Sequence, residues 1–516
     1  MSITPVRNIV IVGGGTAGWM TAAALSKLLP ASCRIRLVES DEIGIIGVGE
    51  ATIPNIRNFN TALEIDEDEF LRRTQGTFKL GIEFVNWGAV GDRYIHGFGK
   101  VGQEMNGISF HHYWLRALQQ GRVSDLGAYS INTVAPLQAK FMRARDDMPG
   151  SPLADIANAF HFDATLYARY LRGLAEKAGV RRTEGKVVQV LQREPDGYIT
   201  AVVMESGEQI GGELFIDCSG IRGLLIEQTL KSGYEDWRHW LPCDRALAVP
   251  CESVAPLLPM TRSTAHSAGW QWRIPLQHRI GNGHVYSSAF MGDDEAASIL
   301  LGHLDGPKLA EPRPVRFTTG RRKQFWNRNC VAIGLSSGFL EPLESTSIHL
   351  IQTAIARLVC FFPHAGFDAP DIVEYNAQTQ FEYERIRDFL VLHYKATERD
   401  DSPFWNHCRT MAIPDTLQHK IDLFRSNGRI FREGTELFTE LSWLQVMVGQ
   451  RILPRGHHPL ADLTSEAELH EFLGNVEGVI RKCVNVMPTQ AEFIRTHCAA
   501  PGAVAGAVAG AASHAA

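Results

Sequence analysis

The fold of this chain is decided by one stretch near its N-terminus, IVIVGGGTAG, which spans residues 9–18. Its first four residues form a continuously apolar, β-branched run, which predicts a strand buried on both faces. The glycines that follow match the pattern G-x-G-x-x-G, and the apolar segment 19–29 predicts a helix that stops at Pro30. A second strand, predicted over 34–38, ends in Glu39, about 20 residues past the last glycine.

Strand, glycines, helix, strand and acid follow one another in the order of a dinucleotide-binding βαβ unit. Glycines lack a Cβ and let the backbone approach a pyrophosphate, while a helix N-terminus offers unpaired N–H groups and the positive end of a dipole. The terminal carboxylate can accept hydrogen bonds from ribose hydroxyls. A glycine turn in another kind of α/β protein would not require this order. The residues predicted to hold the cofactor here are Gly13, Gly15, Thr16, Ala17, Gly18 and Glu39.

Length and composition narrow the class of protein. The chain has 516 residues, 45% of them hydrophobic, and 51 Lys and Arg against 57 Asp and Glu, which gives a net charge of −6. It has no basic cluster to bind nucleic acid or an anionic membrane. A signal sequence and an apolar run of about 18 residues are both absent, and the nine cysteines lack C-x-x-C spacing. These features predict a cytoplasmic protein with reduced thiols and no metal site.

Further glycines and strand ends extend the predicted cofactor site. A second glycine cluster, GIIGVGEATIP over residues 44–54, would let backbone lie flat against a planar ligand, although an ordinary loop has the same composition. Two more predicted strands, 213–217 and 329–333, end at Asp217 and just before Gly334. In a doubly wound sheet a cofactor lies against such strand ends. The additional predicted cofactor contacts are Gly49, Ala51, Asp217, Gly334 and Leu335.

One lysine stands in an unusual context. Lys79 lies between Phe78 and Leu80 and close to two glycines, where a solvating lysine is not expected. The alternative is a lysine with a buried stem and its ammonium in water. The following segment, 87–114, is rich in aromatic residues and histidine and includes His96 and Phe98. Such a surface would suit a flat apolar ligand, but it would equally suit a core.

Two later motifs also stand out. Trp270 and Trp272 alternate on a predicted strand, which puts both indoles on one face, to block a pocket or to fill a core. Residues 345–347 fall near the N-terminus of a predicted helix, which is a site for a small anion. Glu344 beside them would repel an anion, so it is either a structural first-turn acid or a proton acceptor.

These motifs together resemble the flavin-dependent tryptophan halogenase family. The resemblance rests on the N-terminal glycines, GVGEAT at 47–52, FKLG at 78–81, WQWRIP at 270–275 and EPLEST at 341–346, and it runs in order over nearly the whole chain. The element W-x-W-x-I-P separates this family from related flavin monooxygenases. The resemblance implies an α/β, Rossmann-like FAD-binding fold of the flavin monooxygenase type. It predicts an FAD-binding domain over 1–365 with inserted substrate-side segments at about 87–155 and 235–320, a mostly helical substrate-binding region over 366–498, and a disordered Ala/Gly tail over 499–516.

The resemblance also implies a reaction. In the family, a separate flavin reductase supplies reduced FAD, which with O2 and chloride or bromide yields hypohalous acid that passes through a tunnel to an aromatic substrate. The family's essential lysine and glutamate correspond to Lys79 and Glu344. Absence of a second nucleotide fingerprint agrees with dependence on a separate reductase. The residues thought to shield the flavin from the substrate correspond to Trp270, Trp272, Ile274 and Pro275.

The halide site departs from the family pattern. Thr346 and Ser347 correspond to the halide-binding pair, whose second member is usually glycine. If the backbone at Ser347 needs a positive φ, its Cβ costs roughly 1–2 kcal/mol and reshapes the pocket. The choice between chloride and bromide is therefore left open.

The substrate region departs from the pattern as well. Family members that act on free tryptophan hold its charged groups with two tyrosines and a glutamate, whereas the comparable stretch here, 440–449, has no tyrosine pair. Burying an unpaired charge is costly, so we expect an uncharged indole, or an indole within a larger molecule, with walls formed by His96, Phe98 and Trp443. A homodimer is compatible with the sequence. Two rival classes are a flavin monooxygenase that hydroxylates an aromatic substrate and a non-catalytic flavoprotein.

Overall fold

The computed structural model describes residues 4–42 and 49–502 and divides the chain into two compact units. The first unit takes in the chain up to Thr74, Phe162–His239 and Phe317–Glu384. The second takes in Gln75–His161, Trp240–Arg316 and the chain from Arg385 on. The predicted domain bounds, with inserted substrate-side segments at about 87–155 and 235–320, stay a prediction. Residues 44–48 of the predicted glycine segment 44–54, and most of the predicted Ala/Gly tail, lie outside the described residues.

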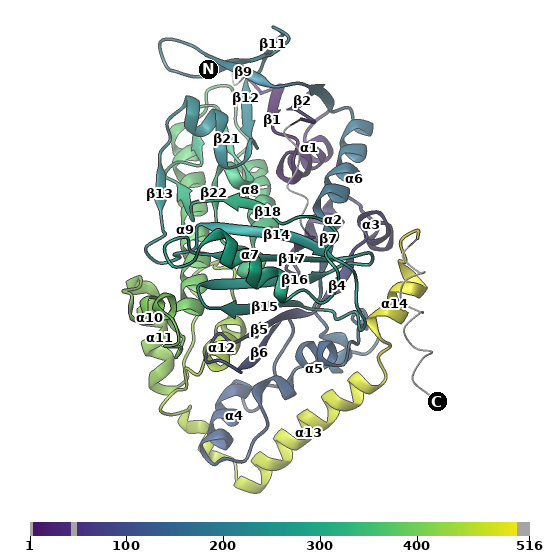
Figure 1. The fold of residues 1–516 in the computed structure, drawn as a ribbon, viewed down its shortest axis with the longest axis vertical. Coiled ribbons are helices and arrows are strands. Elements are labelled where there is room, and N and C mark those ends of the chain that lie inside the picture. Colours follow the sequence, from purple (N-terminus) through teal and green to yellow (C-terminus); the bar gives the residue numbers. More distant parts are fainter. Residues whose placement is uncertain (1–3, 43–48, 503–516) are drawn as a thin grey trace. The chain divides into compact units, whose positions relative to one another are not determined.

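A six-stranded sheet forms the centre of the first unit (Figure 1). Neighbouring strands are parallel except at one edge, where β20 pairs antiparallel with β21. The central strand is apolar and buried from Ile9 to Val12, as predicted. In sheet order the strands are β20 (Trp326–Asn327), β21 (Cys330–Ala332), β12 (Leu214–Asp217), β1 (Asn8–Val12), β2 (Arg34–Glu39) and β8 (Arg181–Glu184). The predicted Rossmann-like α/β fold is confirmed.

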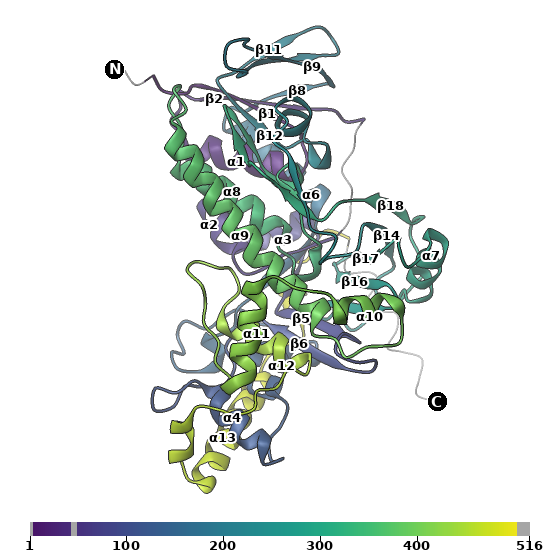
Figure 2. The same cartoon turned by 90° about the vertical axis from the view of Figure 1, so that its left-hand side faces the viewer.

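Helices and two small sheets complete the first unit. Helix α1 (Thr16–Leu28) begins at the glycine turn and packs against α6 (Ala164–Lys177) and α8 (Ser347–Cys360). Figure 2 shows α1 beside the strands β1 and β12. The remaining elements are β3 (Gly49–Ala51), α2 (Ile56–Ala62), α3 (Glu67–Thr74), the antiparallel sheet of β9 (Val187–Gln192), β10 (Ile199–Met204) and β11 (Gln209–Gly211), and the sheet of β13 (Tyr234–Asp236), β19 (Gly320–Arg322) and β22 (Gly338–Phe339).

The second unit is built on a seven-stranded sheet in which all neighbours are antiparallel except β15 and β5. The strand with the two tryptophans, β16, is buried along its whole length near the middle of this sheet. In sheet order the strands are β18 (Arg313–Arg316), β14 (Arg245–Cys251), β17 (Ile280–Tyr286), β16 (Gly269–Pro275), β15 (Thr261–His266), β5 (Gly81–Val85) and β6 (Arg93–Gly97). A further strand, β4 (Thr77–Lys79), pairs antiparallel with β7 (Ala159–Asp163).

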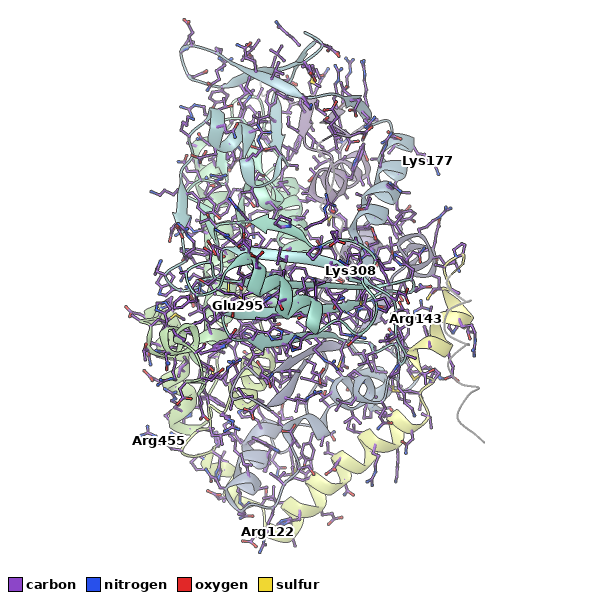
Figure 3. The ribbon with its side chains drawn as sticks, viewed as in Figure 1. Arg122, Arg143, Lys177, Glu295, Lys308 and Arg455 are labelled. Carbon is purple, nitrogen blue, oxygen red and sulfur yellow. The ribbon has the colours of Figure 1, made fainter. Side chains whose placement is uncertain are left out.

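The rest of the second unit is mainly helical, as expected for the C-terminal region. Helix α9 (Ala369–Lys395) contributes residues to both units. The other helices are α4 (Phe110–Gln119), α5 (Ile131–Leu137), α7 (Asp293–Gly302), α10 (Pro403–Thr410), α11 (Asp415–Asn427), α12 (Glu440–Gly449), α13 (Glu466–Asn485) and α14 (Gln490–His497). Within the described residues no helix is long and apolar enough to cross a membrane. Figure 3 shows exposed side chains of both signs, among them Arg122, Lys177 and Glu295.

Candidate active site

The glycine turn of the first unit is packed too tightly for side chains. Gly13 has a φ of +113°, and a Cβ there would lie 2.2 Å from the carbonyl oxygen of Cys218, which follows β12. A Cβ on Gly18 would lie 1.9 Å from the carbonyl oxygen of Gly13. Both glycines are thus required so that the turn, helix α1 and strand β12 can meet.

The N-terminus of α1 has the properties of an anion site. Gly15 is its N-cap, no side chain in the described residues caps the helix, and its first turn has no acid. A Cβ on Gly15 would meet nothing within 4 Å. Open space therefore faces unpaired N–H groups at the positive end of a 13-residue helix. This arrangement fits the pyrophosphate of FAD.

Glu39 lies directly at this turn, where its Oε2 is 1.5 Å from the place of a Cβ on Gly14. Its carboxylate accepts hydrogen bonds from Trp19 Nε1 at 3.3 Å and from Arg182 Nε at 2.5 Å. A carboxylate oxygen has two acceptor sites, so these protein donors leave capacity for a ribose hydroxyl. The predicted position of Glu39 at the end of β2 agrees with the structure.

The other predicted cofactor residues differ in what they offer. The Asp217 carboxylate accepts from the hydroxyl of Ser219 at 2.6 Å and from the backbone N–H groups of Leu225 and Ile226 at 2.7 and 2.8 Å, so it caps the next turn. Gly334 has a φ of +78°, and its Cβ would lie 2.7 Å from the Cβ of Ala17. The structure thus brings Gly334 to the glycine turn and leaves the half-exposed Leu335 beside it. Gly49 and Ala51 lie in β3.

Lys79 is fully buried at the end of β4, with none of its surface exposed. The alternative of a buried stem with its ammonium in water therefore does not hold. Its Nζ lies 5.1 Å from the centre of the Phe98 ring, within the range of a cation–π contact. Two residues singled out from separate motifs, Lys79 and Phe98, thus meet within the second unit.

A buried network holds the strand that carries Lys79. Thr77 donates its hydroxyl hydrogen to the carbonyl of Pro275 at 2.7 Å, so Nδ1 of His161, 3.0 Å away, must donate to the same hydroxyl. Nε2 of His161 then accepts from Thr261 at 2.9 Å. Burial, followed by the positive charges of Lys79 and Arg273, lowers the pKa of His161 well below its ordinary value. The network ties β4 to the last residue of the W-x-W-x-I-P strand.

Trp270 and Trp272 pack side by side on β16, with ring centres 6.2 Å apart. This agrees with the prediction that both indoles share one face. The Trp272 ring lies over Gly283 of β17, where a Cβ would come within 2.0 Å of it. Both rings, together with Ile274 and Pro275, are buried.

A cavity of about 250 Å³ opens beside Phe98 in the second unit. The only charged side chains in its lining are Lys100 and Asp155, which pair at 2.7 Å. Its size is at the small end for ligand pockets, which suits a small ring system. The other lining residues are Gly97, Phe98, Gly99, Ala157, Thr439, Leu441, Ser442 and Gln445.

His96 and Trp443 lie in a buried aromatic cluster next to this cavity. The His96 ring centre is 6.4 Å from that of Phe98 and 5.7 Å from that of Phe389. Phe389 in turn stacks on Phe438 at 3.8 Å and meets Trp443 edge-on at 4.9 Å. Of the three predicted substrate residues, Phe98 alone is in the cavity lining, and the other two support it through packing.

The predicted halide residues surround the start of α8. Pro342–Glu344 forms a short 3₁₀ turn with Glu344 fully buried, Ser345 follows with a φ of +60°, and Thr346 is the N-cap. The Thr346 hydroxyl is buried and has no hydrogen-bond partner among the described residues, and the first turn of α8 has no acid. Ser347 is already helical, so the positive φ considered for it belongs to Ser345. The Cβ of Ser347 therefore brings no left-handed strain.

Sequence reasoning missed Gln445 and the pair Lys100 and Asp155, which line the cavity, and Asn132, which packs against its Gly99. One available indication was that Gln445 is a single polar residue inside an apolar stretch, WLQVMV at 443–448. Among the described residues, no cluster of three or more His, Cys, Asp or Glu could hold a metal.

Comparison with known proteins gives a consistent result. A family model described as tryptophan halogenase matches residues 8–466. The tryptophan 7-halogenase RebH of Lentzea aerocolonigenes is 34% identical over 527 residues, covering 95% of this chain and 98% of that protein. A flavin-dependent halogenase from Xanthomonas campestris has 50% identity and a TM-score of 0.93, covering 96% of this chain and 99% of that one. BrvH, a flavin-dependent halogenase from Brevundimonas sp. BAL3, has 46% identity and a TM-score of 0.92, with coverages of 95% and 99%.

A dinucleotide turn on a parallel sheet, joined in one chain with a buried lysine and a small aromatic cavity, defines a flavin-dependent enzyme of aromatic substrates. The chain belongs to the tryptophan halogenase family, whose members depend on flavin.

Proposed function

We propose that this enzyme halogenates a small, uncharged indole with chloride or bromide. The observation that carries the proposal is the contact of the buried Lys79 ammonium with Phe98, whose ring lines a small cavity. Bound FAD, reduced by a separate reductase, would supply hypohalous acid from O2 and halide. Gly13, Gly15 and Gly18, with the N-terminus of α1 and Glu39, would hold the cofactor.

Lys79 and Glu344 are the proposed catalytic residues. The Lys79 ammonium donates a hydrogen bond to the oxygen of hypohalous acid, which makes the halogen more electrophilic. As the ring carbon bonds to the halogen, the halogen–oxygen bond breaks and the oxygen leaves as water with a proton from Lys79. Glu344 accepts the proton that the ring carbon loses. Hypohalous acid and arene thus give haloarene and water.

Thr346 and Ser347 are the proposed halide site. The unsatisfied, buried hydroxyl of Thr346 is a donor without a partner in the described residues, and α8 presents the positive end of its dipole there. Because Ser347 adopts helical geometry, its side chain is available to narrow the site without backbone strain. We expect this serine to influence the ratio of chloride to bromide use.

The substrate proposal rests on the charge of the cavity lining. Lys100 and Asp155 neutralise each other, and the remaining lining is apolar or neutral. A zwitterionic substrate would have to compete with this pair, whose side chains are 69% and 36% exposed, or bury its own charges without a partner, and the second alternative is the costly one. The relatives named as tryptophan halogenases act on tryptophan by name. We propose that this chain instead favours indole itself, or an indole within a larger molecule.

A reducing compartment suits this chemistry. All nine cysteines lie in the described residues, and none forms a disulfide. We therefore place the enzyme in the cytoplasm, where a reductase can supply reduced FAD. A homodimer is compatible with this assignment.

The decisive test is competition between equal amounts of indole and L-tryptophan, with flavin reductase, NADH and either bromide or chloride, read by mass spectrometry. Halogenated indole should dominate. A preference of the wild type for tryptophan would overturn the substrate proposal. If the variants Lys100→Met or Asp155→Asn then lost this preference, the pair would be assigned to recognition of the amino acid. An oxygenated product without halogen would favour a monooxygenase, and FAD binding without any halogenated product would favour a non-catalytic flavoprotein.

A further inference from the structure

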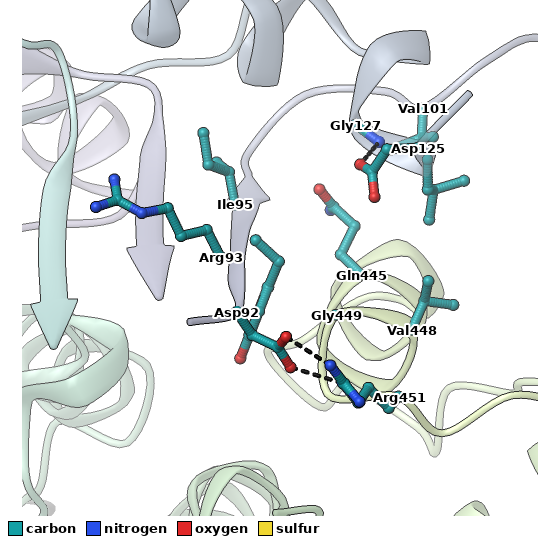
Figure 4. Close-up of a pocket in the computed structure, with 12 residues that line it drawn as sticks. Asp92, Arg93, Ile95, Val101, Asp125, Gly127, Gln445, Val448, Gly449 and Arg451 are labelled. Atoms are coloured by element: carbon teal, nitrogen blue, oxygen red, sulfur yellow. Dashed lines mark hydrogen bonds and ion pairs between the residues drawn. The ribbon is translucent and has the colours of Figure 1, made fainter. Parts of the chain in front are cut away.

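Gln445 connects helix α12 to the backbone beside the cavity. It is buried, with 7% of its surface exposed, and it lines both the 250 Å³ cavity and a second cavity of about 180 Å³. Figure 4 shows it extending from the helix that also carries Val448, near Ile95 of β6. Its position therefore separates two hollows of the second unit.

The Gln445 amide makes three hydrogen bonds to backbone groups. Its Oε1 accepts from the backbone N–H of Gly97 at 3.0 Å, and its Nε2 donates to the carbonyl of the same residue at 3.1 Å. Nε2 also donates to the carbonyl of Leu441 at 3.2 Å, one turn earlier in α12. A side-chain amide that meets both polar groups of one residue fixes that residue in position and in orientation.

Gly97 is the last residue of β6 and lies between His96 and Phe98, so holding its backbone restrains the position of both neighbours. Phe98 is also held by its N–H, which donates to the carbonyl of Leu80, the residue after Lys79, at 3.0 Å. The opposite side of the loop is closed by Asn132 of α5, because a Cβ on Gly99 would lie 2.3 Å from Asn132 Oδ1. Asn132 Nδ2 donates to the same Leu80 carbonyl at 3.0 Å.

We propose that Gln445 is a positioning residue that sets the distance and orientation of Phe98 toward Lys79, and so determines how tightly a neutral indole is held. This inference rests on the proposed function for the identity of the ligand. Gln445 acts through the backbone of Gly97, and its own contribution to the cavity lining is secondary. Without it, the 97–99 loop keeps its contact with Asn132 but loses both hydrogen bonds on the α12 side.

The test compares two isosteric substitutions on the same helix. Gln445→Met removes the clamp while filling its volume. Gln450→Met is the matched control, because Gln450 is also buried, with 1% of its surface exposed, caps the C-terminus of α12 and donates to the carbonyl of His393 at 2.8 Å. We expect Gln445→Met to weaken indole binding about tenfold, which corresponds to about 1.4 kcal/mol for two neutral hydrogen bonds. Binding is measured by calorimetry, and hydrogen exchange of residues 96–99 should accelerate only in Gln445→Met.

Gln445→Glu gives a second, pH-dependent reading. Its ionised carboxylate can accept from the Gly97 N–H but repels the Gly97 carbonyl, whereas the protonated form restores a donor. Relative to the wild type at the same pH, this variant should therefore bind indole better as the pH is lowered. A merely structural role would give no such recovery.

Equal exchange of residues 96–99 in both methionine variants, or equal loss of indole affinity in both, would overturn the clamp. Failure of the wild type to bind indole would instead overturn the proposed substrate, while the exchange measurement would still decide on the clamp.

Discussion

The glycine turn of the first unit and the cavity wall of the second differ in how their parts are spaced along the chain. The turn is formed largely by residues 13–39, and its contacts can be traced to one βαβ unit. The wall is formed where Gly97 meets Gln445, 348 residues later. A local pattern therefore identifies the first site, whereas the second exists only after the sheet and helix α12 have packed.

The two regions also use burial differently. In the turn, absent side chains leave backbone N–H groups open to an anion. In the second unit, the Phe98 ring lines the cavity, contacts the buried Lys79 ammonium and packs near His96. The first arrangement suits an anion and the second suits a neutral ring, which is why we assign the cofactor's phosphates to one and a neutral arene to the other.

The largest effect is expected for Lys79→Ala. Halogenation should be lost while FAD binding and flavin oxidation persist, because Lys79 lies beside Phe98 in the second unit and not in the glycine turn. Product formation is followed by mass spectrometry, and FAD binding by fluorescence. Lys79→Met serves as the control for volume. Substantial halogenation by either variant would break the assignment of Lys79 to catalysis.

Glu344→Gln should slow halogenation by roughly 10²-fold or more, the scale expected for the loss of one general base. Peroxide release from the flavin should continue, since the oxidation of reduced FAD does not need this carboxylate. Rates of product and peroxide formation are measured in parallel. An unchanged halogenation rate would return Glu344 to a structural role in the turn before α8.

Two glycine substitutions distinguish the packing of the glycine turn from its binding of the cofactor. Gly13→Ala should lower Tm by several degrees, because its methyl group would collide with Cys218 backbone at a positive φ. Gly15→Ala should leave Tm nearly unchanged, since its methyl group meets no protein atom, yet weaken FAD binding where the pyrophosphate is expected. Thermal unfolding and FAD titration separate the two effects. Full FAD affinity in Gly15→Ala would move the pyrophosphate elsewhere.

Lowering the pH should destabilise the second unit, with a smaller effect than those of the substitutions above. Burial lowers the pKa of His266 to about 3 and of His284 to about 4, and each is flanked by His303. Since the folded pKa lies below the ordinary 6.5, the stabilisation is complete above pH 6.5 and is lost as the pH falls toward 4. The protection factors of β16 and β17 amides, which correct for the slower intrinsic exchange in acid, should therefore be smaller at pH 5 than at pH 7. A His266→Gln, His284→Gln variant should respond less, and an equal response would exclude these histidines as the cause.

The sequence alone determined the βαβ unit, because each of its requirements is local. A turn without Cβ atoms, an apolar strand and an acid at fixed spacing follow from backbone sterics and hydrogen bonding over about 30 residues. Likewise the alternation of Trp270 and Trp272 predicted their shared face, and helical periodicity predicted the start of α8 near Ser347. The resemblance to the halogenase family drew on the same short motifs.

Only the tertiary structure decided which polar and aromatic residues form the cavity. It shows that the whole of Lys79 is buried and that the positive φ belongs to Ser345 and not to Ser347. It also shows that His96 and Trp443 lie in the aromatic cluster next to the cavity and not in its lining. It also gave the Gln445 amide its partner. These outcomes depend on burial and on contacts between distant segments, which side-chain type and spacing do not specify. The same glutamine in an amphipathic helix can face either solvent or a backbone that only folding brings near.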